Sequence, residues 1–198
     1  MKEKIINLLR ETKREGIEKL IDFMSENGFF ECPCSTQYHL SKDGGLAEHS
    51  FNVYVILTQL NESLNTCIPK ESLIIVSLLH DLGKAGQFGK PGYVLNMVRS
   101  KSKNKETGEY DMVVSSAKPY VTNAELMYEE HEIRSVVIAS KFIELTEKEQ
   151  HAILHHNGLY GKLDSSYGSY YDKDVLSFLL HTADMYCSRF VEKEEVEE

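Results

Sequence analysis

Four residues that could bind a divalent cation stand within or next to apolar stretches of the sequence. They are His49 in GGLAEHSFNVY, the doublet His80 and Asp81 in LLHDLGK, and Asp184 in LLHTADMY. Imidazole nitrogens and carboxylate oxygens are ligands of divalent transition metals, and a cation neutralises carboxylates that are costly to bury alone. The recurrence of these residue types across three apolar segments therefore favours a metal centre over separate, hydrogen-bonded core residues.

Helical periodicity directs these side chains inward. His49 shares a helical face with Val53 and Ile56, at spacings of four and seven residues. Asp184 lies on the inner side of the last predicted helix, at about residues 173–190. We therefore expect the ligands to converge on the core of a helical bundle.

The stretch LLHDLGK ends a short apolar helix that begins after Pro69. Gly83 is expected to turn the chain so that Lys84 faces the same site as Asp81. An ammonium group there can contact a phosphate oxygen or pair with a carboxylate, and we favour the phosphate.

The remaining elements predict one mostly helical domain over residues 1–198. The first segment reads as one interrupted helix or two, with a stop at Asn27 and Gly28. Three further features are a β-hairpin inserted around residues 93–121, helical periodicity that resumes near Ala124, and a capping box at Thr146 and Glu149. The acidic residues 191–198 are expected to form a frayed, solvated helix end, so the fold class is all-α with a small hairpin insertion.

The composition limits the partners and the location of the protein. A net charge of −9 argues against broad binding of long nucleic acid, and no apolar run approaches the length that spans a bilayer. Four scattered cysteines, with only the pair Cys32 and Cys34 close together, indicate neither a disulfide framework nor a structural zinc site. A cytoplasmic protein without membrane partners is expected, and the sequence defines no oligomeric state.

In this order the motifs resemble the H…HD…D signature of the HD-domain metal-dependent phosphohydrolases, an all-α superfamily. GGLAEHSFNVY is similar to its GGL-x-x-HS-x-x-V entry, LLHDLGK to its LLHDIGK, and LLHTADMY to its final ADxx helix. The similarity covers about residues 35–190. It implies an HD-domain helical bundle in which a metal is held by His49, His80, Asp81 and Asp184.

Further histidines resemble those of the HD subfamilies that hold two metals. His131 opens a predicted helix, and AILHHNG offers His155 and His156, of which His156 fits the pattern better. The resemblance implies that Asp81 bridges to a second ion held by His131 and His156. One or two ions of Mn, Fe, Co, Ni or Zn would suit these ligands.

The resemblance implies hydrolysis of a phosphate ester or anhydride in a nucleotide or related small phosphorylated compound. Asp81 and Lys84 would be catalytic, and Lys84 and His39 would contact the substrate. HHNGLYGKLD lacks the Gly-Tyr-Pro motif of the subfamily that cleaves cyclic dinucleotides, which disfavours that activity. A di-iron HD-fold oxygenase and a non-catalytic metal- or nucleotide-binding regulator remain the alternatives.

Two surface features could contribute to substrate binding. One is a run of alternating cations, which we expect on the solvent-exposed face of the hairpin. The alternative is that these cations border the pocket and attract a polyphosphate or a short oligonucleotide. The other is a tyrosine-rich loop that could stack a nucleobase or simply cover the domain. Their residues are Arg99, Lys101, Lys103 and Lys105 in the run, and Tyr160, Tyr167, Tyr170 and Tyr171 in the loop.

Overall fold

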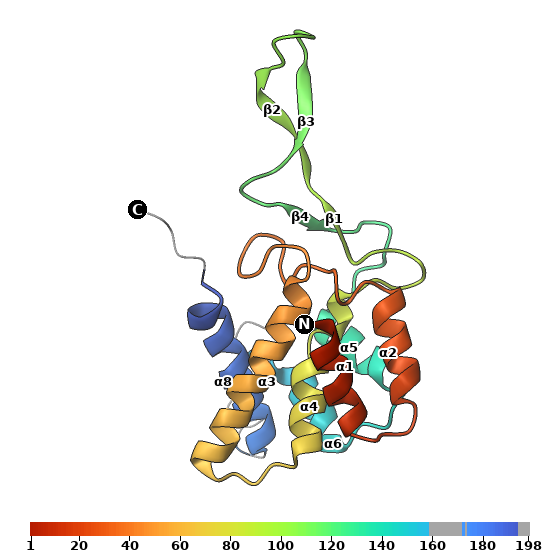
Figure 1. Cartoon of the computed structure of the whole chain (residues 1–198), viewed down its shortest axis with the longest axis vertical. Helices are drawn as coiled ribbons and strands as arrows, with labels where there is room; N and C mark the ends of the chain where they lie inside the picture. The colour runs from red at the N-terminus through yellow and green to blue at the C-terminus, as the bar shows by residue number, and fades with distance from the viewer. Residues whose placement is uncertain (159–171, 173, 194–198) are drawn as a thin grey trace.

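The computed structural model of the chain describes residues 1–158, 172 and 174–193. Helices dominate the described part, and they pack side by side in one body (Figure 1). The α-helices are α1 (Lys2–Glu11), α2 (Ile17–Glu26), α3 (Gly45–Leu64), α4 (Lys70–Leu79), α5 (His131–Ala139), α6 (Glu147–His155) and α8 (Val175–Tyr186). A 3₁₀ turn, η1 (Leu82–Lys84), follows α4, and a π-helical turn, η3 (Cys187–Val191), follows α8.

Helix α4 forms the centre of the bundle. All of its residues from Leu73 to Leu79 are buried, as expected for a helix that is apolar on every side. Helix α3 packs against α4 and α8, and α6 packs against both α4 and α8. The first segment is two helices, α1 and α2. Helix α1 packs against α2, α3 and α4, and the side chains of Ile5 and Leu9 on α1 and Leu20 on α2 are buried. The core is therefore continuous across the elements that carry the predicted metal ligands.

The N-terminus of α6 has the capping box that the local sequence predicted. Thr146 accepts a hydrogen bond from the Glu149 amide at 3.3 Å, and the Glu149 carboxylate accepts one from the Thr146 amide at 2.9 Å, which confirms the capping box of α6. Among the described residues no helix combines the length and the apolar character needed to cross a bilayer.

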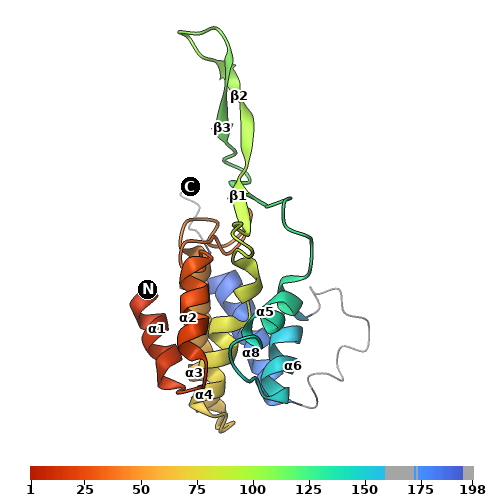
Figure 2. The ribbon, with the colours of Figure 1, turned by 90° about the vertical axis from the view of Figure 1, so that its right-hand side faces the viewer.

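Four short strands lie where the hairpin was expected. Strand β1 (Tyr93–Leu95) pairs with β4 (Tyr120–Thr122), and β2 (Met97–Lys103) pairs with β3 (Tyr110–Val114), both antiparallel. The β2–β3 register is irregular between Arg99 and Lys103. The cations in this run therefore do not all keep the regular two-residue spacing that would place them on one face of a strand. The β2–β3 arm projects away from the helical body (Figures 1 and 2).

Helical periodicity resumes near Ala124 in the sequence, but the helix itself, α5, begins at His131, the residue that was expected to open it. The residues before it are tied to the base of the strands instead, since the Asn123 amide donates to the Gly92 carbonyl at 3.0 Å. Glu130, the residue before α5, has an extended backbone with ψ of 134°. These tertiary contacts override the apolar periodicity of the segment. The tyrosine-rich loop and residues 194–198 lie outside the described residues.

Candidate metal centre

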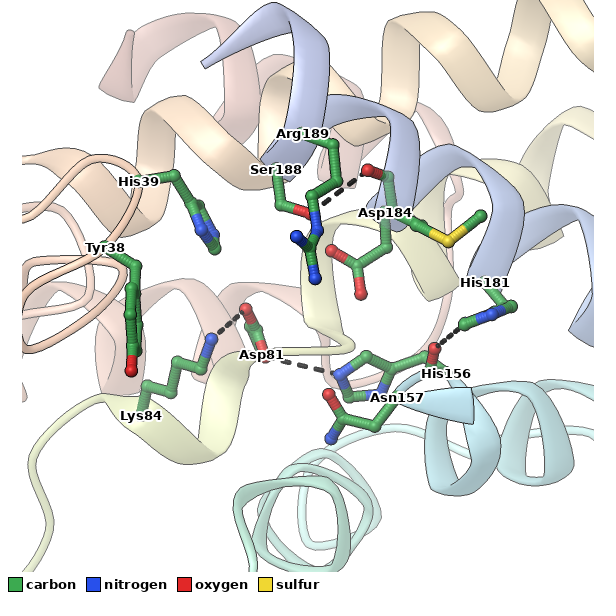
Figure 3. Close-up of a pocket in the computed structure, with 11 residues that line it drawn as sticks. Tyr38, His39, Asp81, Lys84, His156, Asn157, His181, Asp184, Ser188 and Arg189 are labelled. Atoms are coloured by element: carbon green, nitrogen blue, oxygen red, sulfur yellow. Dashed lines mark hydrogen bonds and ion pairs between the residues drawn. The ribbon is translucent and has the colours of Figure 1, made fainter. Parts of the chain in front are cut away.

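Five elements bring the six predicted metal ligands together. Helix α3 supplies His49, the link between α4 and η1 supplies His80 and Asp81, and α8 supplies Asp184. His131 and His156 come from the start of α5 and from the residue after α6. A cavity of about 670 Å³ opens onto this cluster, and Asp81, His156 and Asp184 line it (Figure 3).

The Asp81 carboxylate lies between two pairs of histidines. Its Oδ2 atom is 3.7 Å from His49 Nε2 and 3.5 Å from His80 Nε2. Its Oδ1 atom is 3.1 Å from His131 Nε2 and 3.5 Å from His156 Nε2. Asp81 is buried, and Oδ1 makes no hydrogen bond within the described residues. A buried carboxylate oxygen without a hydrogen bond is costly unless it binds a cation.

Asp184 lies beside the first histidine pair, His49 and His80. Its Oδ1 atom lies 3.1 Å from His49 Nε2. The ligand atoms of His80, His156 and Asp184 also lie within 4.8 Å of one another, so the two halves of the cluster are continuous. The arrangement has the compactness that one or two neighbouring ions require.

Backbone carbonyls fix the orientation of two of these rings. His80 Nδ1 donates to the Ser77 carbonyl at 2.8 Å, and His156 Nδ1 donates to the Ile153 carbonyl at 2.7 Å. Because a carbonyl only accepts, each Nδ1 carries a proton and each Nε2 points into the centre, where it can bind a metal when it carries no proton of its own. Metal-binding histidines are held in this way by their second nitrogen.

The inward nitrogens face one another in pairs. His49 Nε2 is 3.2 Å from His80 Nε2, and His131 Nε2 is 3.4 Å from His156 Nε2. The amide nitrogen of Asn157 donates to His131 Nε2 at 3.1 Å, so this nitrogen also carries a lone pair. Imidazole nitrogens this close to one another, with a carboxylate between the two pairs, can bind a cation among them once their Nε2 protons are lost. The donor set therefore fits divalent metal through these pairs as well as through Asp81 Oδ1.

Glu192 contacts the proposed ligand His49, a contact that the sequence did not predict. Residues 191–198 were expected to form a solvated tail, but Val191 belongs to η3 and Glu192 is only 6% exposed. Its carboxylate accepts a hydrogen bond from His49 Nδ1 at 2.9 Å and one from Asn52 Nδ2 at 3.0 Å. The expectation of a frayed tail was wrong for Glu192, because its hydrogen bonds to His49 and Asn52 on α3 hold the chain against the bundle.

The charges in the centre stabilise one another. Burial would raise the pKa of Asp81, but Lys84 and His80 lower it well below its usual value. Burial opposes the charge of Lys84, yet Asp81 raises its pKa well above the usual range, and Lys84 Nζ lies 2.6 Å from Asp81 Oδ2. The pKa of Asp184, which burial would raise, is lowered by the hydrogen bond with His49. All three groups are therefore charged near neutral pH.

His39 lines the cavity beside the first histidine pair (Figure 3). Burial lowers its pKa to about 4, so the ring is neutral. Its Nε2 lies 3.4 Å from the Cys34 thiol, which stays protonated because burial raises the pKa of this thiol to about 11. His155, the alternative to His156, stacks near His151 with ring centroids 4.4 Å apart.

The alternating cations of the hairpin do not line the cavity. Arg99 instead stacks over the Tyr110 ring within the arm, with the guanidinium carbon 3.8 Å from the ring centroid. The sequence hypothesis that these cations border the site therefore has no support from the cavity lining.

A helical bundle with a buried His and Asp cluster at the floor of a cavity defines a class of metal-binding α-helical domains. The family model for the HD domain matches residues 46–186, which is more than half of the chain, and the chain thus belongs to the HD-domain family. This family includes metal-dependent phosphohydrolases. Comparisons with curated proteins and with solved structures gave no significant match.

Proposed function

We propose that this protein is a metal-dependent phosphohydrolase that cleaves a phosphate ester or anhydride in a nucleotide or related small compound. The observation that carries the proposal is the position of Asp81, whose two carboxylate oxygens face two separate histidine pairs. A carboxylate can bridge two ions in this position, whereas a purely structural site needs neither a bridge nor an open cavity. The cytoplasm predicted from the sequence remains the proposed location.

Two ion sites share Asp81 in this proposal. Divalent ions of Mn, Fe, Co, Ni or Zn bound there would lower the pKa of a coordinated water and attract phosphoryl oxygens. The proposed ligands are His49, His80, Asp81 and Asp184 for the first ion, and Asp81, His131 and His156 for the second.

Lys84 and His39 are the proposed substrate contacts. The Lys84 side chain is 15% exposed at the cavity wall, so its ammonium group can contact a phosphoryl oxygen while its partner Asp81 holds it in place. This contact would stabilise the negative charge that develops during displacement. His39 is on another part of the wall, where a neutral imidazole can hydrogen-bond to the substrate.

The variant Asp81→Asn tests the proposal. It removes the bridging charge but keeps the side-chain volume, so we expect turnover to fall by at least about a hundredfold and metal content to fall as well. The measurement is phosphate release from a panel of nucleotides by Mn²⁺-loaded protein, together with metal analysis. Asp22→Asn, the same change at an exposed position of α2, is the matched control.

Three other outcomes would count against this proposal. Unchanged turnover in Asp81→Asn would overturn the proposed role of the cluster. A wild-type protein that binds metal but releases no phosphate from any nucleotide would favour a regulator. An iron-loaded protein that is purified without oxygen, and whose absorption spectrum changes when oxygen is added, would favour an oxygenase.

A further inference from the structure

The cavity has more room and more charge than one phosphoryl group needs. Its volume of about 670 Å³ falls in the range of pockets that enclose a whole small ligand. Asp81 and Asp184 line it, and Ser188 and Arg189 of η3 belong to the wall that follows α8 (Figure 3). Arg189 was not among the residues predicted from the sequence.

Arg189 continues a helical face that lines the cavity. It follows His181 and Met185 at intervals of four residues, and all three residues belong to the cavity wall. In η3 the Glu192 amide donates to the Cys187 carbonyl at 3.0 Å, the i to i+5 bond of a π turn. Figure 3 shows the guanidinium group extending into the cavity between His39 and Asp184.

The turn is fixed to the metal centre at its far end. Glu192 follows η3 directly and binds His49 Nδ1 at 2.9 Å and Asn52 Nδ2 at 3.0 Å. At the other end, Asp184 lies 3.1 Å from His49 Nε2. The backbone that carries Arg189 is therefore held on both sides by contacts to one proposed ligand.

Two different cations approach the cavity from different walls. Lys84 comes from η1 and lies next to Asp81, whereas Arg189 comes from η3 on the α8 side (Figure 3). A guanidinium group binds a phosphate through two parallel hydrogen bonds, whereas an ammonium group acts as a point charge. The walls thus offer a second, separate place for an anionic group.

We infer that Arg189 forms an anion subsite for a second phosphoryl group of the substrate, apart from the group bound at the metal centre. This inference rests on the proposed function and narrows it to substrates with at least two phosphoryl groups, such as a nucleoside diphosphate or another pyrophosphate compound. Arg189 is a substrate-binding residue here, and Lys84 contacts the phosphoryl group that reacts.

A pair of non-hydrolysable probes tests the subsite. Methylphosphonate carries one phosphonate group and methylenediphosphonate carries two, and calorimetry on the Mn²⁺-loaded protein gives both dissociation constants. In Arg189→Gln we expect the affinity for the diphosphonate to fall by about tenfold more than the affinity for methylphosphonate, because one charge-assisted contact is lost. Arg189→Lys should restore part of the difference, since it keeps the charge and loses the planar fork.

The controls separate this inference from the proposed function. Arg10→Gln makes the same change at an exposed position of α1, where Arg10 pairs with Glu18, and the ratio of the two affinities should remain that of the wild type. Metal content before and after each titration shows whether the diphosphonate has removed the ions. An equal loss of affinity for both probes in Arg189→Gln, or no loss for either, would overturn the subsite. Absence of phosphate release from nucleotides would count against the proposed function and leave these binding data unaffected.

Discussion

The orientation of His49 depends on a residue near the end of the described chain. Glu192 is buried, and its two carboxylate oxygens accept hydrogen bonds from His49 Nδ1 and Asn52 Nδ2 at 2.9 and 3.0 Å. A carboxylate on the far nitrogen fixes the tautomer of a metal-binding histidine and makes its other nitrogen a stronger donor to the metal. Glu192 would therefore control metal affinity without binding the metal itself.

Glu192→Gln is expected to weaken metal binding about 10- to 100-fold, because the amide oxygen still accepts the Nδ1 proton but the negative charge is lost. Titration of the metal-free protein with Mn²⁺ gives the affinity directly. Glu18→Gln, the same change at a surface residue of α2, is the control. An unchanged dissociation constant for Mn²⁺ in Glu192→Gln would show that the carboxylate holds the chain against α3 but has no effect on metal binding.

For single residues, the sequence predicts those positions that follow from the spacing of side chains along one helix. His49 and Asp184 could be assigned to the core because each occupies the apolar face of one helix. Glu192 could not, because it stands in a run of acidic residues typical of a solvated tail and its partner is 143 positions away. Arg189 was missed although helical spacing carried a signal for it, since it follows His181 and Met185 at intervals of four residues on the face that lines the cavity.

At the scale of secondary-structure elements, the contact between η1 and α5 sets the position of His131 relative to Asp81. A Cβ atom on Gly83 would lie 2.1 Å from the His131 carbonyl oxygen and 2.9 Å from the Arg134 Cβ. The Gly83 amide also donates to Ser135 Oγ at 2.8 Å. Gly83 lies in the 3₁₀ turn that directs Lys84 to Asp81, as expected, but it has no positive φ, so the turn itself does not require glycine. Its small size is what allows α5 to approach Asp81.

Gly83→Ala should push the start of α5 away from η1 and move His131 relative to Asp81. We expect bound metal to fall from two ions toward one, with a loss of stability of about 1 to 3 kcal/mol from overpacking. Metal analysis and urea unfolding measure these effects. Gly108→Ala is the matched control, since a Cβ atom there meets nothing within 4 Å and the change affects only a strained loop in the β2–β3 arm. Full metal content in Gly83→Ala would contradict this role of the contact.

For the molecule as a whole, one buried ion pair links segments that are distant in the sequence. Arg14, in the connection between α1 and α2, donates to both carboxylate oxygens of Glu149 at 2.8 and 2.7 Å. Ser72 on α4 donates to the same carboxylate at 2.8 Å. Arg14 also pairs with Glu71. The local capping box at Thr146 was predictable, whereas the partners of Glu149 from α4 and from the α1–α2 connection follow only from the tertiary fold.

The Arg14–Glu149 pair makes the stability of the bundle sensitive to acid. Burial would raise the pKa of Glu149, but hydrogen bonds from Arg14, Thr146 and Ser72 lower it below its usual 4.5. A group whose pKa is lower in the folded state stabilises the fold above its unfolded pKa, and this stabilisation is lost as the pH falls through the folded value. The contribution of Glu149 should thus be complete at pH 7 and decline below about pH 4.5.

Glu149→Gln should lower the free energy of unfolding by about 3 kcal/mol at pH 7, because it leaves the Arg14 guanidinium largely buried without its main counter-charge. The difference from the wild type should shrink in acid, where protonation of Glu149 removes the same charge from the wild-type protein. Urea unfolding of both proteins at pH 7 and in steps below pH 4.5 measures this convergence. Glu147→Gln, an exposed position in the same turn of α6, is the control. A difference that stays constant in acid would mean that Glu149 stabilises the bundle through packing and capping, without its charge.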